Sequence, residues 1–281
     1  MPASESGNAG GGVATTMFVT SRDGTRIAFD RTGEGPPLVL VAGAFGNRSF
    51  GNPMGALLEP HFTIINYDRR GRNESGDAPR YAVEREVEDI DALIREAGGS
   101  ARVFGMSSGA VLALEAAVDG LEITKLALYE PPFVVDDSRS PIPEDYVTHI
   151  KGLVAAGRRG DAVEYVLTVA VDVPAEFVAQ MRTEPVWPAL EAVAHTLAYD
   201  GAIMGDTMSG KPLSSERAKR WASITVPTVV LDGGASPPFM HSGAQTLADV
   251  LPNAHRRTLE GQTHDVNADV LAPVLKDFFA G

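Results

Sequence analysis

The 281-residue sequence contains no cysteine. This absence excludes a disulfide framework, a thiolate-ligated metal site and a cysteine nucleophile, and it favours a reducing or redox-indifferent compartment. The sequence also lacks any apolar stretch approaching the roughly 20 residues of a membrane-spanning helix. It shows no internal repeat or heptad pattern either. We therefore expect a globular protein rather than a membrane protein, a solenoid or a coiled coil.

Positive charge is scarce. The chain has 24 lysines and arginines against 37 aspartates and glutamates, a formal net charge of -13. Such a surface repels phosphate and gains nothing from counterion release, which argues against nucleic acid and anionic membranes as partners. The expected partner is a small-molecule substrate, and the sequence leaves both a monomer and a homo-oligomer open.

The first 14 residues are rich in glycine, alanine, serine and proline. Because they contain neither a basic region nor an apolar core, we expect a disordered tail rather than a secretory signal, and hence a cytoplasmic protein. The rest is long for one domain, but its length and 44% hydrophobic content fit one α/β domain that carries an insertion.

Short β-branched runs alternate with helical patterns over most of the chain. The pattern predicts strands at 17–20, 25–31, 37–41, 62–67, 101–106, 123–129, 226–231 and 254–259, with helices at 83–97 and 268–279 among them. This alternation is typical of a doubly wound, mostly parallel sheet.

The strands stop between about residues 132 and 223. Helices are predicted there at 146–156, 162–171, 175–182 and 190–197. We therefore predict a core formed by residues 15–132 and 224–281 and a helical cap at 133–223, inserted after the sixth strand. Seven residues of the cap could line an access tunnel, although residues at helical spacing also form ordinary core: Tyr146, Tyr165, Phe177, Met181, Trp187, Met204 and Met208.

A candidate nucleophile follows the strand predicted at 101–106. Residues 105–109 read Gly-Met-Ser-Ser-Gly and lead into an apolar helical pattern. The match to G-x-S-x-G between a strand and a helix predicts a nucleophile elbow, in which a strained turn projects the Ser107 hydroxyl above the sheet. A helix N-cap serine is a second role that the same residue can play.

A serine hydroxyl needs a base, and His264 is the candidate. It alone among the six histidines lies in a glycine-rich polar loop, between the last predicted strand and the last helix. The other five have surface or packing roles as their simplest interpretation: His61, His149, His195, His241 and His255. None shows the spacing of a metal site, so we expect neither a catalytic metal nor another cofactor.

Two further motifs accompany the elbow at Ser107 and the loop that carries His264. Residues 40–45 read Leu-Val-Ala-Gly-Ala-Phe and residues 67–71 read Tyr-Asp-Arg-Arg-Gly. Together with the elbow and the His264 loop, they make the chain from about Met17 to Gly281 resemble the α/β-hydrolase superfamily. Ala42 stands where the family has histidine, but the resemblance requires only backbone N–H groups for an oxyanion hole, here assigned to Ala44 and Ser108. The turn at residues 68–71 is predicted to be rigid and held by charge pairs rather than catalytic.

The acid that would orient His264 departs from the family pattern. The usual aspartate follows the strand predicted at 226–231, but residues 233–237 read Gly-Gly-Ala-Ser-Pro. Asp232 belongs to the strand end, where the pleat dictates its direction. Glu130 lies just past the preceding strand, where certain dehalogenases and lactone hydrolases of the superfamily carry their acid, and it is long enough to reach the imidazole. We prefer Glu130, with Asp232 as the alternative and an absent or water-bridged acid as a third possibility.

The resemblance implies a serine-dependent hydrolase that cleaves a small or medium, largely apolar ester, lactone or thioester through an acyl-enzyme. A serine at the nucleophile position argues against epoxide hydrolase and haloalkane dehalogenase chemistry, which uses aspartate there. Two alternatives use the same triad, a cofactor-free perhydrolase and a natural-product cyclase or lyase. A third, of another class, is a non-catalytic small-molecule receptor.

Overall fold

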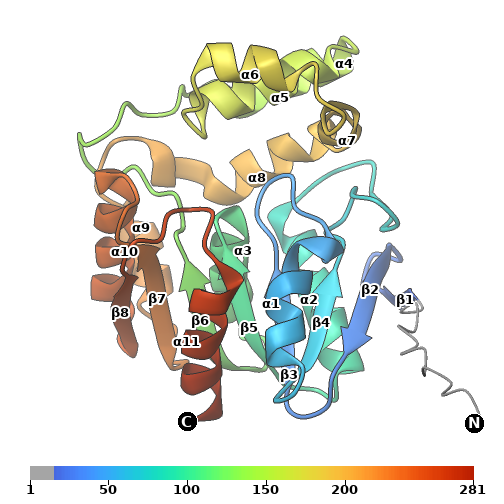
Figure 1. Ribbon diagram of the computed structural model, residues 1–281, viewed down its shortest axis with the longest axis vertical. Helices are drawn as coiled ribbons and strands as arrows, with labels where there is room; N and C mark the ends of the chain where they lie inside the picture. The colour runs from blue at the N-terminus through green and yellow to red at the C-terminus, as the bar shows by residue number, and fades with distance from the viewer. Residues whose placement is uncertain (1–15) are drawn as a thin grey trace, which may run out of the picture.

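The computed structural model describes residues 16–281, so the tail predicted at residues 1–14 lies outside the described part. An eight-stranded sheet runs through this part in the order β1-β2-β4-β3-β5-β6-β7-β8 (Figure 1). The strands are β1 (Met17–Thr20), β2 (Arg26–Thr32), β3 (Pro37–Val41), β4 (Thr63–Tyr67), β5 (Ala101–Met106), β6 (Ile123–Tyr129), β7 (Thr228–Gly233) and β8 (Ala254–Leu259). β2 pairs antiparallel with β1 and β4, and all other neighbours are parallel. This confirms the doubly wound, mostly parallel sheet.

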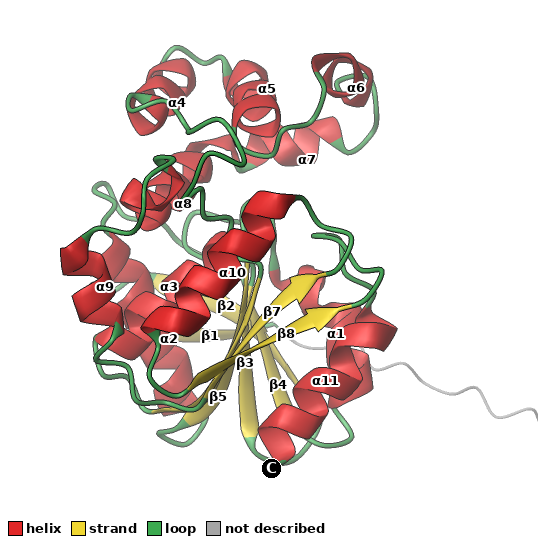
Figure 2. Ribbon diagram, turned by 90° about the vertical axis from the view of Figure 1, so that its left-hand side faces the viewer, coloured by secondary structure: helices red, strands yellow, loops and turns green. Residues whose placement is uncertain are grey.

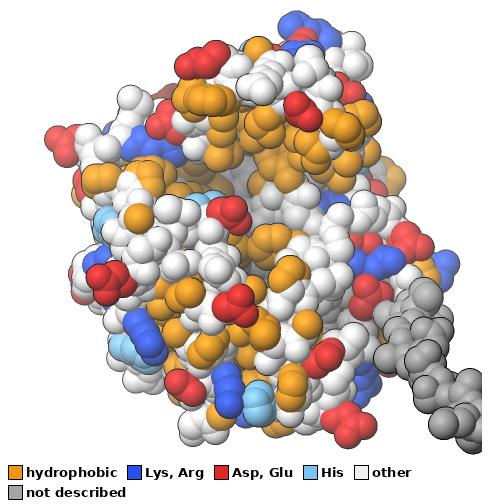
Figure 3. Space-filling model, in the orientation of Figure 1, with side chains coloured by type: hydrophobic (Ala, Val, Ile, Leu, Met, Phe, Trp, Pro, Cys, Tyr) orange, Lys and Arg blue, Asp and Glu red, His pale blue; other side chains and the backbone are white. Residues whose placement is uncertain are grey.

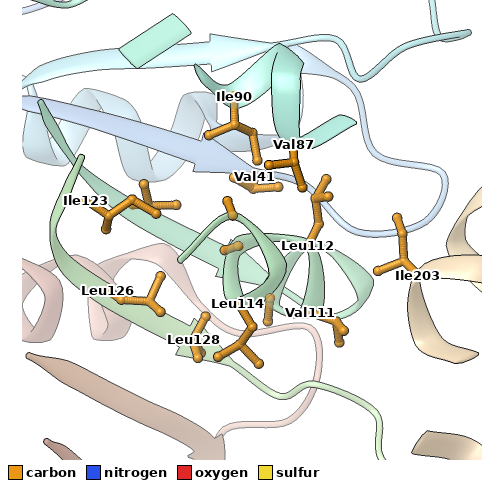
Figure 4. Close-up of a cluster of buried hydrophobic side chains, with 14 of the residues drawn as sticks. Val41, Val87, Ile90, Val111, Leu112, Leu114, Ile123, Leu126, Leu128 and Ile203 are labelled. Carbon is orange, nitrogen blue, oxygen red and sulfur yellow. The ribbon is translucent and has the colours of Figure 1, made fainter. Parts of the chain in front are cut away.

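Helices cover both faces of the sheet (Figure 2). One face carries α1 (Asn52–Leu58) and α11 (Ala268–Ala280), and the other carries α2 (Val83–Glu96), α3 (Ser108–Val118), α9 (Ser215–Trp221) and α10 (Pro238–Val250). Because successive strand side chains point to opposite faces, the apolar run of β3 serves both layers. Leu38 and Leu40 belong to the cluster under α1 and α11. Val39 and Val41 belong to the cluster under α2 and α3, where Figure 4 shows Val41 among the packed side chains.

The chain between β6 and β7 is helical. It contains α4 (Tyr146–Ala155), α5 (Arg159–Val169), α6 (Ala175–Met181), α7 (Trp187–Ala192), η2 (Ala194–Thr196), α8 (Leu197–Met204), η3 (Gly205–Met208) and α9. We call the part from α4 to α8 the helical insertion. Figure 1 shows α4–α7 beyond the ends of the strands, with α8 between them and the sheet. The insertion has a hydrophobic cluster of its own, which includes Ile150 and Leu197, while Ile203 and Met204 of α8 join the core of the sheet.

Two predicted elements differ from the structure, one by an interruption and one by a shift along the chain. The helix predicted at 190–197 is interrupted, because α7 ends at Ala192 and a 3-10 turn precedes α8. β7 begins at Thr228 rather than at residue 226 and extends to Gly233. Pro227 has no N–H to donate to the sheet, and Thr228 makes the first such bond, to Asn253 O. Within residues 16–281, no helix is long and apolar enough to cross a membrane.

Candidate active site

Ser107 lies in a sharp turn between β5 and α3, with φ 58° and ψ -129°. A positive φ is rare for a residue with a Cβ and persists where the surrounding structure enforces it. Here the Ser107 N–H donates to Tyr129 O at 2.9 Å, and the Ser107 carbonyl accepts from the Ala110 N–H at 2.9 Å. The neighbouring strand and the first turn of α3 therefore hold the strained geometry that the motif predicts.

Glycines let backbone segments approach closely around this turn. A Cβ on Gly105 would lie 2.5 Å from Gly109 O, and a Cβ on Gly109 would lie 2.4 Å from Val41 O. A Cβ on Gly43 would lie 2.8 Å from the Cβ of Ser107. Because the first two contacts are with backbone, they cannot be relieved by a side-chain rotation.

We expect Gly105→Ala to lower the free energy of unfolding by about 1–3 kcal/mol through overpacking. The matched control is Gly152→Ala in the interior of α4, where an added Cβ has no heavy atom within 4 Å. That variant should gain up to about 1 kcal/mol from the better helix propensity of alanine. Urea unfolding of both variants measures the difference, and equal shifts would contradict the packing argument.

Glu130 and His264 lie in contact although 134 positions separate them in the sequence. Glu130 follows β6 with φ 44° and is fully buried. Its Oε2 lies 2.8 Å from His264 Nδ1, and its Oε1 accepts from the Gly233 N–H at 2.7 Å. The carboxylate is thus held at one oxygen by β7 and directs the other at the imidazole.

Asp232, the alternative acid, is engaged elsewhere. It accepts from Arg256 at 2.7 and 2.9 Å and from Thr258 Oγ1 at 3.0 Å, and its Oδ2 lies 2.5 Å from His241 Nδ1. Burial alone would raise the pKa of Asp232, but the hydrogen bonds from Arg256 and His241 outweigh it and hold the pKa below its ordinary value. Of the two carboxylates, only Glu130 contacts His264 in residues 16–281.

A cavity of about 260 Å³ opens beside Ser107 and His264. Most of its wall is apolar and comes from the insertion, from η3 and from α10: Tyr146, Val166, Ala170, Leu197, Met204, Met208, Phe239 and Met240. Figure 3 shows a hollow with hydrophobic side chains at its margin, between the insertion above and the rest of the molecule below. The arrangement suits a mostly apolar molecule with one polar reacting group.

Three of the seven predicted lining residues, Tyr146, Met204 and Met208, line this cavity. The other four, Tyr165, Phe177, Met181 and Trp187, do not. Phe177 is 57% exposed, and Trp187 is buried in the insertion's own cluster. Helical periodicity places a residue on an apolar face but does not say which neighbour that face meets.

Ala44 and Ser108 also line the cavity. Ser108 is the first residue of α3, so its N–H has no acceptor within the helix. Among the described residues, the Ala44 N–H donates no backbone hydrogen bond. Neither of these two N–H groups therefore has a backbone acceptor among the described residues.

Sequence reasoning missed Asp200 of α8, which lines the cavity and is only 6% exposed. Ser108 Oγ donates to its Oδ1 at 2.7 Å, and Arg69 and Arg72 pair with it at 2.6 and 2.7 Å. Burial alone would raise the pKa of Asp200, but the charges of Arg72 and Arg69 outweigh it and hold the pKa below its ordinary value. One signal was available, since Asp200 is the only charged residue in the apolar stretch Leu197–Met204.

The turn after β4 has the ion-paired character that its sequence predicts. Arg69 forms two 2.7 Å hydrogen bonds with Glu86, and Arg70 forms bonds of 2.7 and 2.9 Å with Asp89. These four side chains are at most 2% exposed. Within residues 16–281, no group of three or more histidine, aspartate or glutamate side chains is placed to hold a metal ion.

The model of the Alpha/beta hydrolase family matches residues 38–274, so the chain belongs to this family and is an enzyme. A crystal structure of an alpha/beta hydrolase from Sphaerobacter thermophilus DSM 20745 is 57% identical, with a TM-score of 0.86 over 94% of this chain and 100% of that chain. The enol-lactonase from Burkholderia xenovorans LB400 shares the fold at 21% identity, with a TM-score of 0.68 over 94% of this chain and 100% of that one.

A curated relative is an uncharacterized hydrolase, YraK, from Bacillus subtilis (strain 168). It is 30% identical over 116 residues, which are 40% of this chain and 43% of that protein. The chain thus spans less than half the length of this curated relative.

Proposed function

We propose that the protein is a serine-dependent hydrolase of small or medium, largely apolar esters, lactones or thioesters. The observation that carries the proposal is the 2.8 Å contact between Glu130 and His264, because it supplies an oriented imidazole at the cavity that Ser107 lines. A serine hydroxyl becomes an effective nucleophile when such a base removes its proton.

In the proposed reaction, Ser107 Oγ attacks the carbonyl carbon while His264 Nε2 takes the hydroxyl proton. The carbonyl oxygen becomes an oxyanion that accepts hydrogen bonds from the Ala44 and Ser108 N–H groups. When this intermediate collapses, the carbonyl reforms and the leaving oxygen or sulfur departs with the proton from His264. Glu130 accepts from Nδ1–H throughout, which fixes the tautomer and stabilises the imidazolium.

Water completes the cycle. It attacks the acyl-enzyme carbonyl while His264 removes one of its protons, and the second intermediate expels Ser107 Oγ, which recovers that proton. The products are the free acid and the alcohol or thiol, and a lactone gives one hydroxy acid. Each step uses side chains and backbone N–H groups that line the cavity or contact His264.

The apolar wall leads to an expected substrate preference. We expect aryl butyrate to be hydrolysed with a kcat/KM at least about 100-fold above that of an aryl succinate monoester, because burying the free carboxylate without a partner is unfavourable. The charged carboxylates that line the cavity are Asp172 and Asp200, and among residues 16–281 no lysine or arginine lines it that could pair with the substrate's carboxylate. The measurement is steady-state hydrolysis of a panel of aryl esters, with a simple enol-lactone included.

Equal rates on the two esters would contradict the substrate class, and ligand binding with no turnover of any ester, lactone or thioester would contradict the proposed function itself.

A further inference from the structure

We propose that Asp200, which lies on the helical insertion, is a positioning residue for the oxyanion-binding site. It holds both N–H donors of that site, those of Ala44 and Ser108, in place. The inference rests on the proposed function, since it assigns the Ala44 and Ser108 N–H groups to the oxyanion. It adds that a carboxylate on α8, 92 positions beyond Ser108, keeps these two groups in place.

The first connection runs through Ser108. Its Oγ donates to Asp200 Oδ1 at 2.7 Å, and both side chains are buried. The Ser108 N–H belongs to the same residue, directly after the strained Ser107. Tethering the side chain therefore limits how the first turn of α3 can rotate relative to the cavity.

The second connection runs through Arg72 to the loop that carries Ala44. Arg72 Nη2 pairs with Asp200 Oδ2 at 2.7 Å, while its Nη1 donates to Gly43 O at 2.6 Å and to Gly46 O at 2.9 Å. These two carbonyls flank Ala44. Because the guanidinium is planar and bonded on both sides, it fixes the position of this loop relative to Asp200 more firmly than a flexible lysine ammonium would.

A positioning role and a purely electrostatic role of Asp200 predict opposite effects of removing its charge. Asp200, Glu86, Arg69 and Arg72 form a buried group with two charges of each sign. A carboxylate near a developing oxyanion opposes it by Coulomb repulsion, so its removal should speed the reaction if charge alone mattered. If Asp200 instead positions the N–H donors, its removal should slow the reaction, because donors that are less firmly held stabilise the transition state less.

The test is Asp200→Asn, which keeps the shape and removes the charge. We expect kcat on an aryl butyrate to fall by about 10- to 100-fold with KM changed by less than about twofold. The inhibition constant of an aryl trifluoromethyl ketone, whose adduct with Ser107 carries the oxyanion, should rise by about the same factor as kcat/KM falls. A non-reacting alcohol of similar size should keep its affinity.

Ser108→Ala removes one connection without disturbing the charges, and it should lower kcat by about tenfold. It decides the question if Asp200→Asn fails to fold, as judged by near-ultraviolet circular dichroism. The matched control is Asp206→Asn, since Asp206 also lies between β6 and β7 and pairs with an arginine, Arg217, at an exposed position outside the cavity. Its kcat should match the wild type.

An unchanged or raised kcat in folded Asp200→Asn would overturn the positioning role while leaving the proposed function intact. So would a loss confined to KM, or an unchanged kcat in Ser108→Ala where only that variant folds. A wild-type protein that neither hydrolyses the ester nor reacts with a fluorophosphonate would overturn the proposed function first, and the inference with it.

Discussion

Ser107→Ala is expected to abolish stoichiometric labelling by a fluorophosphonate and to lower kcat on an aryl ester by about 10⁶-fold. The reason is that every covalent step of the proposed mechanism passes through Ser107 Oγ, which the strained turn at φ 58° presents to the cavity. Residual catalysis would come from the cavity and the oxyanion donors alone. Intact mass after incubation with the probe measures labelling, and steady-state kinetics measures turnover.

The matched control is Ser223→Ala. Ser223 Oγ donates to Arg220 O at an exposed position outside the cavity, so its loss should change neither labelling nor turnover. A second control, His264→Ala, should retain the hydroxyl yet react far more slowly, because the base is missing. Labelling that persists in Ser107→Ala at the wild-type rate would place the nucleophile elsewhere and contradict the mechanism.

The second large effect is expected from Glu130→Gln, which should lower kcat by about 10³- to 10⁴-fold. The amide keeps a carbonyl oxygen that can accept from the Gly233 N–H, so the loop should hold. It carries no negative charge, so it cannot stabilise an imidazolium at His264, and its N–H₂ group can donate to Nδ1 and select the wrong tautomer. Kinetics and melting temperature on the same preparation separate catalysis from stability.

Asp232→Asn provides the matched comparison. Its kcat should stay within about twofold of the wild type, because the carboxylate contacts Arg256, Thr258 and His241 rather than His264. Its stability should fall. Because the pKa of Asp232 is lower in the folded protein than its ordinary value of 3.8, its ionised carboxylate stabilises the fold. That stabilisation is fully present above pH 3.8 and is lost as the pH falls through the pKa of the folded state.

The stability difference between wild type and Asp232→Asn should therefore shrink as the pH is lowered from 7 towards 3. Thermal melting over that range measures it. A large kcat loss in Asp232→Asn with normal activity in Glu130→Gln would reverse the assignment of the acid.

Much of the fold could be predicted because its signals are local. The run at residues 37–41 is apolar at nearly every position, as in a strand buried on both faces, and it is β3 in the structure. The break between α7 and α8 could not be predicted from the sequence, because Ala192 and Leu197 both suit a helix. Only tertiary packing decides where the helical stretch is interrupted. The same holds for Trp187, whose apolar face meets the insertion's own core rather than the cavity.

The sequence by itself determined the alternating strands and helices, the elbow at Ser107 and the loop that carries His264. Periodicity, glycine placement and the order of motifs are properties of neighbouring residues and need no knowledge of distant ones. Only the tertiary structure decided that Glu130 meets His264 across 134 positions and that Asp200 meets Ser108 across 92. Such contacts depend on strand register and helix packing, which bring side chains within hydrogen-bonding distance at a precision that no local pattern carries.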